Sequence, residues 1–234
     1  MEPTEQNPFY EADDPELYEK TRRRFRRTIN FLFGVAVKGI ENIPDEKPAM
    51  LAFVHRSNID AFVLGITVPR VLRGMGKDKL WNWYWLGAGG YLGKRGIFPV
   101  DRDNPSRTSY DTSLEIIRRG QVQAMAPEGT HHNRGPHIGP TKFGLGRIVA
   151  LAASEGLECP VIPVGMVTEH LNPFTPIPIV YGKPFRLDGP VDTVRQRKSS
   201  AQEFDELARD EMQNVFYEAM DMPVQNRLVN LVRR

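Results

Sequence analysis

Short apolar runs alternate with amphipathic stretches through most of this 234-residue chain, and this alternation is the strongest constraint on its fold. The runs predicted to be buried strands are 49–54, 96–100, 121–127, 159–166 and 177–182. Helices are predicted over 58–72, 106–119, 141–155 and 199–220, the last capped near Ser199 or Ser200. This pattern indicates an α/β fold: a single layered domain over 1–234, with a mostly buried mixed sheet flanked by helices. Pro173 and Pro176 just before 177–182, with Pro178 at its second position, predict that this strand lies at an edge of the sheet.

A basic amphipathic helix is predicted over 15–38, after a loosely ordered lead-in at 1–14, with Pro15 as its first residue and Gly39 just past its end. Such a helix can lie in a membrane interface, because its apolar stripe enters the headgroup boundary while its arginines meet anionic lipids. The residues expected to touch the membrane are Arg22, Arg23, Phe25, Arg26 and Arg27. The alternative is a helix packed on the domain with a solvated basic face.

Composition narrows the class of protein. The 31 basic and 29 acidic residues leave a formal net charge of +2, which is too small to indicate a nucleic-acid partner. A single cysteine, Cys159, excludes an intrachain disulfide and fits a reducing compartment. The longest apolar run, 29–37, is far shorter than the roughly 20 residues that span a bilayer. We therefore expect a peripheral protein at the cytoplasmic face of the cell membrane.

The stretch AFVHRSNIDAFVLG, residues 52–65, interrupts apolar sequence with a short polar segment. If a strand ends at His55 and a helix starts near Ser57, the turn can bring Asp60 back beside the imidazole. The carboxylate would orient the ring, which could then take a proton from a substrate hydroxyl as a general base. The structural alternative is a capping box of Ser57 and Asp60 beside an incidental histidine.

Two other predicted strand ends carry residues suited to an anionic ligand. MAPEGTHHNRGPHIGPTKFG, residues 125–144, joins a Gly-rich loop to a helix N-terminus, and KRGIFPVDRDNPSR, residues 94–107, is rich in arginine. Glycine allows close backbone approach, helix amides attract anions, and the planar fork of arginine suits phosphate. A base beside two such loops suggests group transfer onto a hydroxyl of a phosphorylated substrate.

Two further features have alternative interpretations. His131, His132 and His137 with Glu128 could form a metal site, but no familiar ligand spacing is present, so we expect no metal. The run LWNWYWLGAGGYLG, residues 80–93, could be a buried aromatic cluster or an interfacial segment. We favour the interfacial interpretation, with Trp83 in contact with the membrane.

Four sequence blocks resemble those of the glycerolipid acyltransferase family, typified by 1-acylglycerol-3-phosphate acyltransferases. HRSNID resembles its H-x-x-x-x-D motif, and GIFPVDR, PEGT and VIPVGM resemble its second, third and fourth blocks, in the family's order within 55–166. The resemblance implies acyl transfer from acyl-CoA or acyl carrier protein to a hydroxyl of lysophosphatidic acid, without a cofactor or metal. Acylation of glycerol 3-phosphate or another lysophospholipid, a non-catalytic membrane-binding module and a metal-dependent phosphoesterase are the alternatives.

The resemblance also implies roles for individual residues. His55 would be the base and Asp60 its orienting partner, and the substrate phosphate site would comprise Arg102, Glu128, Gly129 and Thr130. Where the third block of the family usually continues Thr-Arg-Ser, this chain has two histidines after Thr130. Arg134 or Lys142 is expected to supply the missing positive charge.

Overall fold

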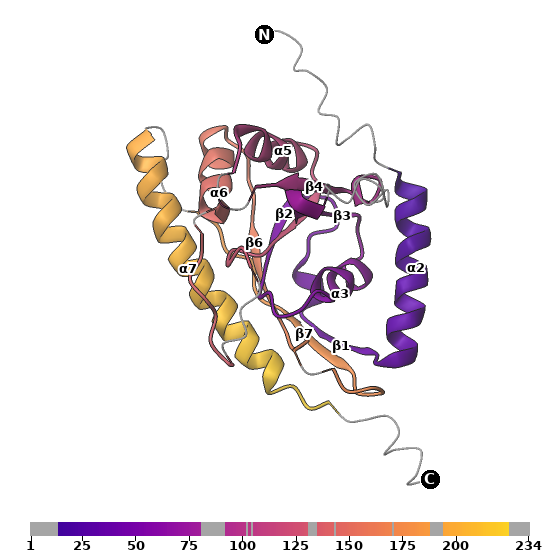
Figure 1. Ribbon diagram of the computed structural model, residues 1–234. Coiled ribbons are helices and arrows are strands. Elements are labelled where there is room, and N and C mark those ends of the chain that lie inside the picture. The colour runs from indigo at the N-terminus through magenta and orange to yellow at the C-terminus, as the bar shows by residue number, and fades with distance from the viewer. Residues whose placement is uncertain are drawn as a thin grey trace, which may run out of the picture.

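A seven-stranded mixed sheet forms the centre of the molecule (Figure 1). The computed structural model describes residues 14–80, 92–101, 103, 105–130, 135–142, 144–169, 171–187 and 194–224. The strands are β1 (Val35–Lys38), β2 (Ala49–Phe53), β3 (Leu72–Lys77), β4 (Ile97–Val100), β5 (Val122–Met125), β6 (Val161–Met166) and β7 (Ile177–Tyr181). Their order across the sheet is β1-β7-β6-β2-β5-β3-β4, with β6, β2, β5, β3 and β4 mutually parallel and the β6–β7 pair antiparallel. The predicted α/β class with a mixed sheet is confirmed.

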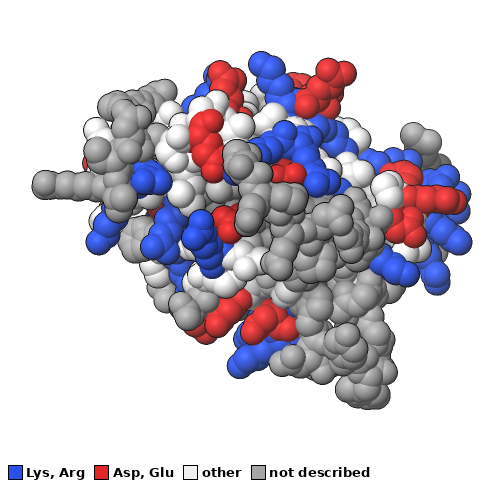
Figure 2. Space-filling model, turned by 90° about the horizontal axis from the view of Figure 1, so that it is seen from above, with Lys and Arg blue, Asp and Glu red and all other residues white. Residues whose placement is uncertain are grey.

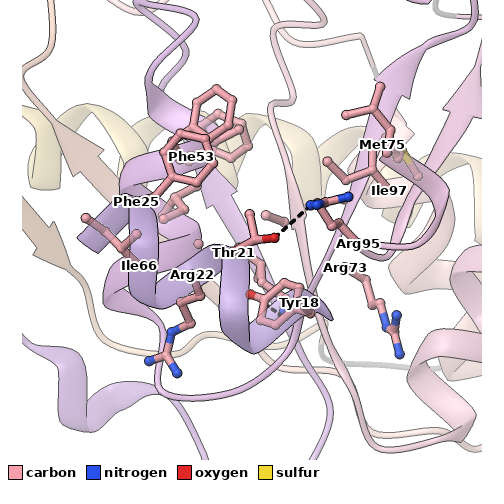
Figure 3. A pocket seen from close by; sticks show the side chains of 18 residues that line it. Tyr18, Thr21, Arg22, Phe25, Phe53, Ile66, Arg73, Met75, Arg95 and Ile97 are labelled. Atoms are coloured by element: carbon pink, nitrogen blue, oxygen red, sulfur yellow. Dashed lines mark hydrogen bonds between the residues drawn. The ribbon is translucent and has the colours of Figure 1, made fainter. Parts of the chain in front are cut away.

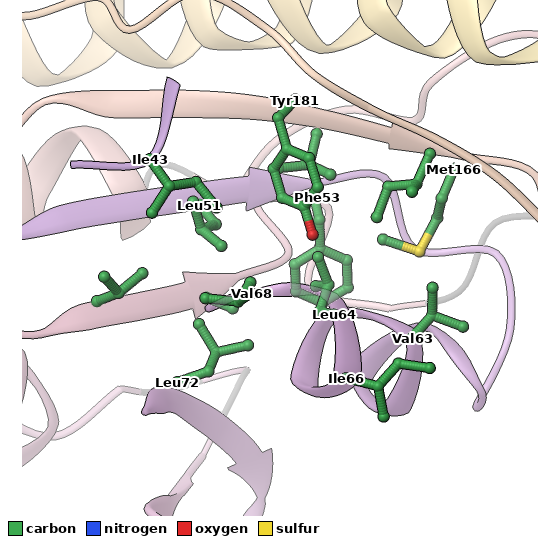
Figure 4. Packing of buried hydrophobic residues seen from close by; sticks show 14 of the residues in the cluster. Ile43, Leu51, Phe53, Val63, Leu64, Ile66, Val68, Leu72, Met166 and Tyr181 are labelled. Atoms are coloured by element: carbon green, nitrogen blue, oxygen red, sulfur yellow. The ribbon is translucent and has the colours of Figure 1, made fainter. Parts of the chain in front are cut away.

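Helices cover both faces of this sheet. The helices are α2 (Pro15–Leu32), α3 (Asp60–Thr67), α5 (Arg107–Arg118), α6 (Gly144–Ser154) and α7 (Val194–Met220), with 3₁₀ turns η1 (Ile40–Asn42) and η2 (Asp78–Leu80). Helices α2 and α3 lie on one face, and α5, α6 and α7 lie on the other (Figure 1). The two cores meet at β2, whose alternate residues enter one or the other. Figure 4 shows the α3 side, where Leu51 and Phe53 of β2 pack with Leu64.

Two predictions are wrong because the chain forms strand β1 after α2. The helix expected over 15–38 ends at Leu32, because Gly34 turns the chain in a left-handed conformation (φ 93°). The following β-branched residues, Val35 and Val37, form β1 instead, which pairs in parallel with β7. The strand at 177–181 is therefore not at the edge, since β1 covers it.

Two other boundaries also differ from the prediction. The helix expected over 58–72 ends at Thr67, two residues before Pro69, which has no backbone N–H to continue it. The missed strand β3 then begins at Leu72. Helix α7 starts at Val194 rather than near Ser199, whose hydroxyl donates to the carbonyl oxygen of Gln196 within the helix. The start predicted for α5 is confirmed, since Ser106 is its N-cap.

Helices α6 and α7 pack unusually closely around Gly146. A Cβ atom at this position would lie 2.0 Å from the carbonyl oxygen of Ala201, so only glycine permits the contact. The buried carboxylate of Asp205 accepts a hydrogen bond from the Gly146 amide at 3.2 Å through Oδ2. Its Oδ1 has no hydrogen-bond partner among the described residues, and burial raises the pKa of Asp205 to about 7.

Candidate active site

His55 and Asp60 meet where the sheet gives way to α3. His55 follows β2 by two residues, and Asp60 is the first residue of α3. The imidazole Nδ1 lies 2.9 Å from Asp60 Oδ2, with the His55 side chain 12% exposed and the Asp60 side chain fully buried. A carboxylate on Nδ1 fixes the ring tautomer and leaves Nε2 as the position that can exchange a proton with a ligand. The pair that the sequence suggested is therefore assembled.

The same carboxylate also organises the turn. Its Oδ2 accepts hydrogen bonds from the amides of Arg56 (2.7 Å) and Ser57 (2.8 Å), while the Ser57 hydroxyl accepts a 3.4 Å bond from the Ile59 amide. Reaching back to the Ser57 amide is what the acidic residue of a capping box does. The two interpretations of this stretch are thus compatible, since one carboxylate holds both the turn and the imidazole.

The strands on either side of β2 each bring a polar residue to this turn. Because β5, β2 and β6 are parallel, their carboxyl ends meet at one edge of the sheet. Glu128, after β5, accepts bonds from the His55 amide (3.3 Å) and the Gly139 amide (2.8 Å). The hydroxyl of Thr168, after β6, donates to Asp60 Oδ1. Thr168 was not among the sequence candidates, although its position just after the fourth block was a signal that could have found it.

The residues expected to bind a phosphate are placed differently from one another. Glu128 is only 1% exposed, and both its carboxylate oxygens accept hydrogen bonds from backbone amides. It therefore binds the backbone of the turn, where the sequence led us to expect a phosphate contact. Gly129 adopts a left-handed conformation (φ 70°) against the side-chain methylenes of Lys142, and Thr130 is exposed. The Lys142 ammonium bonds Asp103 at 3.1 Å, which holds the pKa of the Asp103 carboxyl below its usual range. Arg102 and Arg134 lie outside the described residues.

The segment after Gly135 is held from the opposite side by α7. The Gln213 side chain accepts from the Ile138 amide (2.9 Å) and donates to the Pro136 carbonyl (2.7 Å). The Arg56 guanidinium lies 4.7 Å from the centre of the Phe216 ring and donates to the His137 carbonyl at 2.7 Å. Helix α7 therefore contacts both Arg56, which is next to His55, and the loop after Gly135.

The expected absence of a metal stays a prediction. Within the parts of the chain that the structure describes, no three metal-ligating side chains gather, and His137 contacts the hydroxyl of Tyr217 at 3.3 Å. His131 and His132 lie outside those parts.

An apolar pocket of about 190 Å³ lies between α2, α3, β3 and β4 (Figure 3). Phe25 of α2 and Phe62 of α3, whose ring centres are 4.7 Å apart, belong to its lining. Phe53 lines it too, and its ring lies edge-on to the His55 imidazole with 5.4 Å between ring centres. The far end is bounded by Tyr18, whose hydroxyl accepts from the Leu72 amide at 3.1 Å. The Phe53 ring thus contacts both the pocket and the histidine.

Most of the apolar stripe of helix α2 packs against the rest of the domain. Tyr18 and Ile29 are buried, and Phe25 packs on Phe62, so this part of the stripe does not face outward. Its C-terminal turn is different, because Phe31 is 74% and Leu32 is 39% exposed. The exposed arginines of the helix are Arg23, Arg24, Arg26 and Arg27, while Arg22 is partly buried and pairs with Glu19. Trp83 and most of its aromatic run lie outside the described residues.

Charge on the surface is mixed. Figure 2 shows Lys and Arg side chains interspersed with Asp and Glu on the face seen from above, which fits the small net charge. A search of the described helices finds none with the length and apolar character needed to cross a membrane.

Comparisons with known proteins agree with the geometry. The sequence model of the acyltransferase family matches residues 34–167. A 1-acyl-sn-glycerol-3-phosphate acyltransferase from Bacillus subtilis (strain 168) is 33% identical over 115 residues, which are 49% of this chain and 57% of that protein. The crystal structure of the 1-acyl-sn-glycerophosphate (LPA) acyltransferase PlsC from Thermotoga maritima resembles this fold with a TM-score of 0.54 at 21% identity, covering 82% of this chain and 78% of that one. The matched segment thus spans little more than half the length of the Bacillus relative, and the Thermotoga structure supports the fold.

Proposed function

The chain belongs to the acyltransferase family, and we propose that it transfers a fatty acyl group from a thioester to the free hydroxyl of lysophosphatidic acid. The observation that carries this proposal is the His55–Asp60 pair at 2.9 Å, beside an aromatic ring that also lines an apolar pocket. An oriented base and a place for a hydrocarbon chain are the two things that such a transfer requires. The printed activity of the Bacillus relative supports the choice of acceptor.

The geometry gives each group a task. The acceptor hydroxyl attacks the thioester carbonyl carbon while its proton passes to Nε2 of His55, so a tetrahedral oxyanion forms. Asp60 stays ionised and stabilises the imidazolium through Nδ1, as in serine hydrolase triads. When the intermediate collapses, the carbon–sulfur bond breaks and the thiolate takes the proton from Nε2. The products are an ester and a free thiol, and no acyl-enzyme forms.

We propose that the acceptor phosphate binds beside Gly129. The left-handed turn there leaves room for the methylenes of Lys142, which pack against Gly129, and the Lys142 ammonium supplies a positive charge beside this turn. Arg102 and Arg134 stay candidates from the sequence. The Asp103 carboxylate pairs with the Lys142 ammonium, so a substrate phosphate would compete with Asp103 for it.

A panel of substrates tests the proposal. Purified protein is given acyl-CoA or acyl carrier protein thioesters with lysophosphatidic acid, glycerol 3-phosphate or lysophosphatidylcholine, and thiol release is followed. We expect turnover with lysophosphatidic acid to exceed that with the other two acceptors. Equal rates with all acceptors, or with none present, would contradict the proposed acceptor. The panel also identifies the donor.

Gly65 gives a test of the pocket. It lines the pocket from α3, and a Cβ added there meets nothing within 4 Å. We expect Gly65→Leu to fill the pocket, lowering kcat/KM for palmitoyl-CoA at least about tenfold while sparing octanoyl-CoA, because lost methylene burial limits binding. Gly65→Ala is the matched control and should change neither value. If Gly65→Leu lowered both donors equally, the acyl chain would lie elsewhere.

We propose that the C-terminal turn of α2 rests on an anionic membrane surface. Phe31 and Leu32 are exposed there, and Arg26 and Arg27, also exposed, lie on the preceding turn. Apolar side chains can enter the headgroup boundary while nearby arginines meet lipid phosphates. Such contact would present the enzyme to lipids at the cytoplasmic face of the cell membrane, the location that we expect from the sequence. Phe25, which the sequence led us to expect at the membrane, lines the apolar pocket instead.

Vesicle binding measures this contact. We expect Phe31→Ala with Leu32→Ala to weaken binding to phosphatidylglycerol-containing vesicles about tenfold or more, because two apolar side chains no longer leave water. The matched control is Leu207→Ala with Met220→Ala, which removes two exposed apolar side chains of α7, on the other face of the sheet. Equal effects of the two pairs, or binding that ignores anionic lipid and salt, would refute the proposal.

A further inference from the structure

We propose that Thr168 is a positioning residue, whose hydroxyl holds Asp60 in the orientation that serves His55. The proposal rests on the proposed function for its kinetic consequences, but its structural consequence can be measured without substrate. Neither the sequence blocks nor the family match reaches this residue, since the match ends at residue 167.

The contact follows from the strand arrangement. β6 pairs in parallel with β2, with Val164 opposite Phe53, so the residues just after the two strands meet at the same edge. Thr168 and Asp60 are 108 residues apart in sequence, yet the Thr168 hydroxyl donates to Asp60 Oδ1. Thr168 is 2% exposed and Asp60 is fully buried, so water does not substitute readily for this donor.

The two carboxylate oxygens have separate partners. Oδ2 accepts from the Arg56 and Ser57 amides and contacts His55 Nδ1, all on one short stretch of chain. Oδ1 is anchored by Thr168 from a different strand. With Oδ1 fixed, the carboxylate cannot rotate about its Cβ–Cγ bond without breaking a buried hydrogen bond. The hydroxyl therefore sets the plane in which Oδ2 meets the imidazole.

Other charged groups surround this network. On one side Glu128 holds the His55 amide, and the Arg56 guanidinium is directed to the His137 carbonyl and the Phe216 ring. On the other, the Glu169 carboxylate accepts from the Thr168 amide at 3.2 Å. Glu128, Arg56 and Glu169 thus contact backbone groups or an aromatic ring. The Thr168 hydroxyl, in contrast, donates directly to the Asp60 carboxylate.

The test compares three variants in the full chain. Thr168→Val removes the hydroxyl at nearly constant volume, and Thr168→Ser keeps it. The matched control is Thr67→Val on α3, which removes a hydroxyl that bonds the Tyr181 hydroxyl at 2.6 Å. Each protein is followed by thermal unfolding, by kcat and acceptor KM, and by the NMR signals of the His55 ring without substrate.

We expect Thr168→Val to lower kcat about tenfold or more with little change in acceptor KM, because a hydrogen bond to a charged group is lost. The NMR signals of the His55 ring should also shift, because the carboxylate beside its Nδ1 is no longer anchored through Oδ1. Thr168→Ser should restore both values, and Thr67→Val should lose stability without either change.

Unchanged kcat and unchanged NMR signals of the His55 ring in Thr168→Val would overturn the proposal. Equal changes in Thr67→Val would also overturn it, because both effects would then be general consequences of destabilisation. If no protein transfers acyl groups while the ring signals still move only in Thr168→Val, the positioning role stands and the proposed function fails.

Discussion

We expect replacement of His55 by alanine to lower the turnover of acyl transfer at least about a thousandfold while the fold survives. The physical reason is that the acceptor hydroxyl would have to lose its proton without a base beside it. His55 is at a strand end with a partly exposed side chain, so its truncation removes little of the core. Thiol release from acyl-CoA in the presence of lysophosphatidic acid measures the effect.

His55→Gln separates proton transfer from packing. Glutamine can keep a hydrogen bond to Asp60 but cannot act as a base at neutral pH, so it should be as inactive as alanine. Thermal unfolding and vesicle binding should match the native protein in both variants. Turnover that persists in both variants would show that His55 is not the base of the transfer.

We expect Asp205 to make the stability of the native protein fall as pH rises between about 4 and 7. Its pKa is raised to about 7 by burial in the folded state and is near 4 in the unfolded chain, so the folded state binds the proton more tightly. The contribution is full below pH 4 and is lost once the group ionises above pH 7. Such a shift corresponds to a loss of at most roughly 4 kcal/mol.

Asp205→Asn should flatten this dependence. Urea unfolding at pH 5 and pH 8.5 should find the variant more stable than the native protein at the higher pH, with a clearly smaller advantage at the lower one. Asp210→Asn, an exposed carboxylate on the same helix, is the control and should change neither value by much. A difference between native and Asp205→Asn that is the same at both pH values would show that Asp205 ionises normally.

The sequence predicted those elements whose signals are local. Strands β2 and β6 are continuous apolar runs and β5 is broken only by Gln123, and each strand is followed by site residues at its carboxyl end, as the motif spacing indicated. β3 was missed because LRGMGK contains two charged residues and two glycines, and it is a strand because β4 and β5 pair with it. β1 was missed because its valines continued the apolar pattern of α2, and the turn at Gly34 decided the outcome.

The candidate site divides in the same way. His55 and Asp60 are five positions apart, so a turn that short could be inferred to bring them together. The contact of Thr168 with Asp60 and that of Gln213 with the loop after Gly135 depend on strand order and helix packing, which no local pattern encodes. Glu128 was expected to bind the substrate phosphate, but its carboxylate accepts from the His55 amide, a contact that depends on the pairing of β2 with β5.

The most direct test of direct transfer by the His55–Asp60 pair is the first turnover after rapid mixing with acyl-CoA. Without an acceptor, no thiol should be released and the mass of the protein should stay unchanged, and adding lysophosphatidic acid should start release in the native protein but not in His55→Ala. A stoichiometric burst of thiol without acceptor, with an acyl group attached to the protein, would contradict the account.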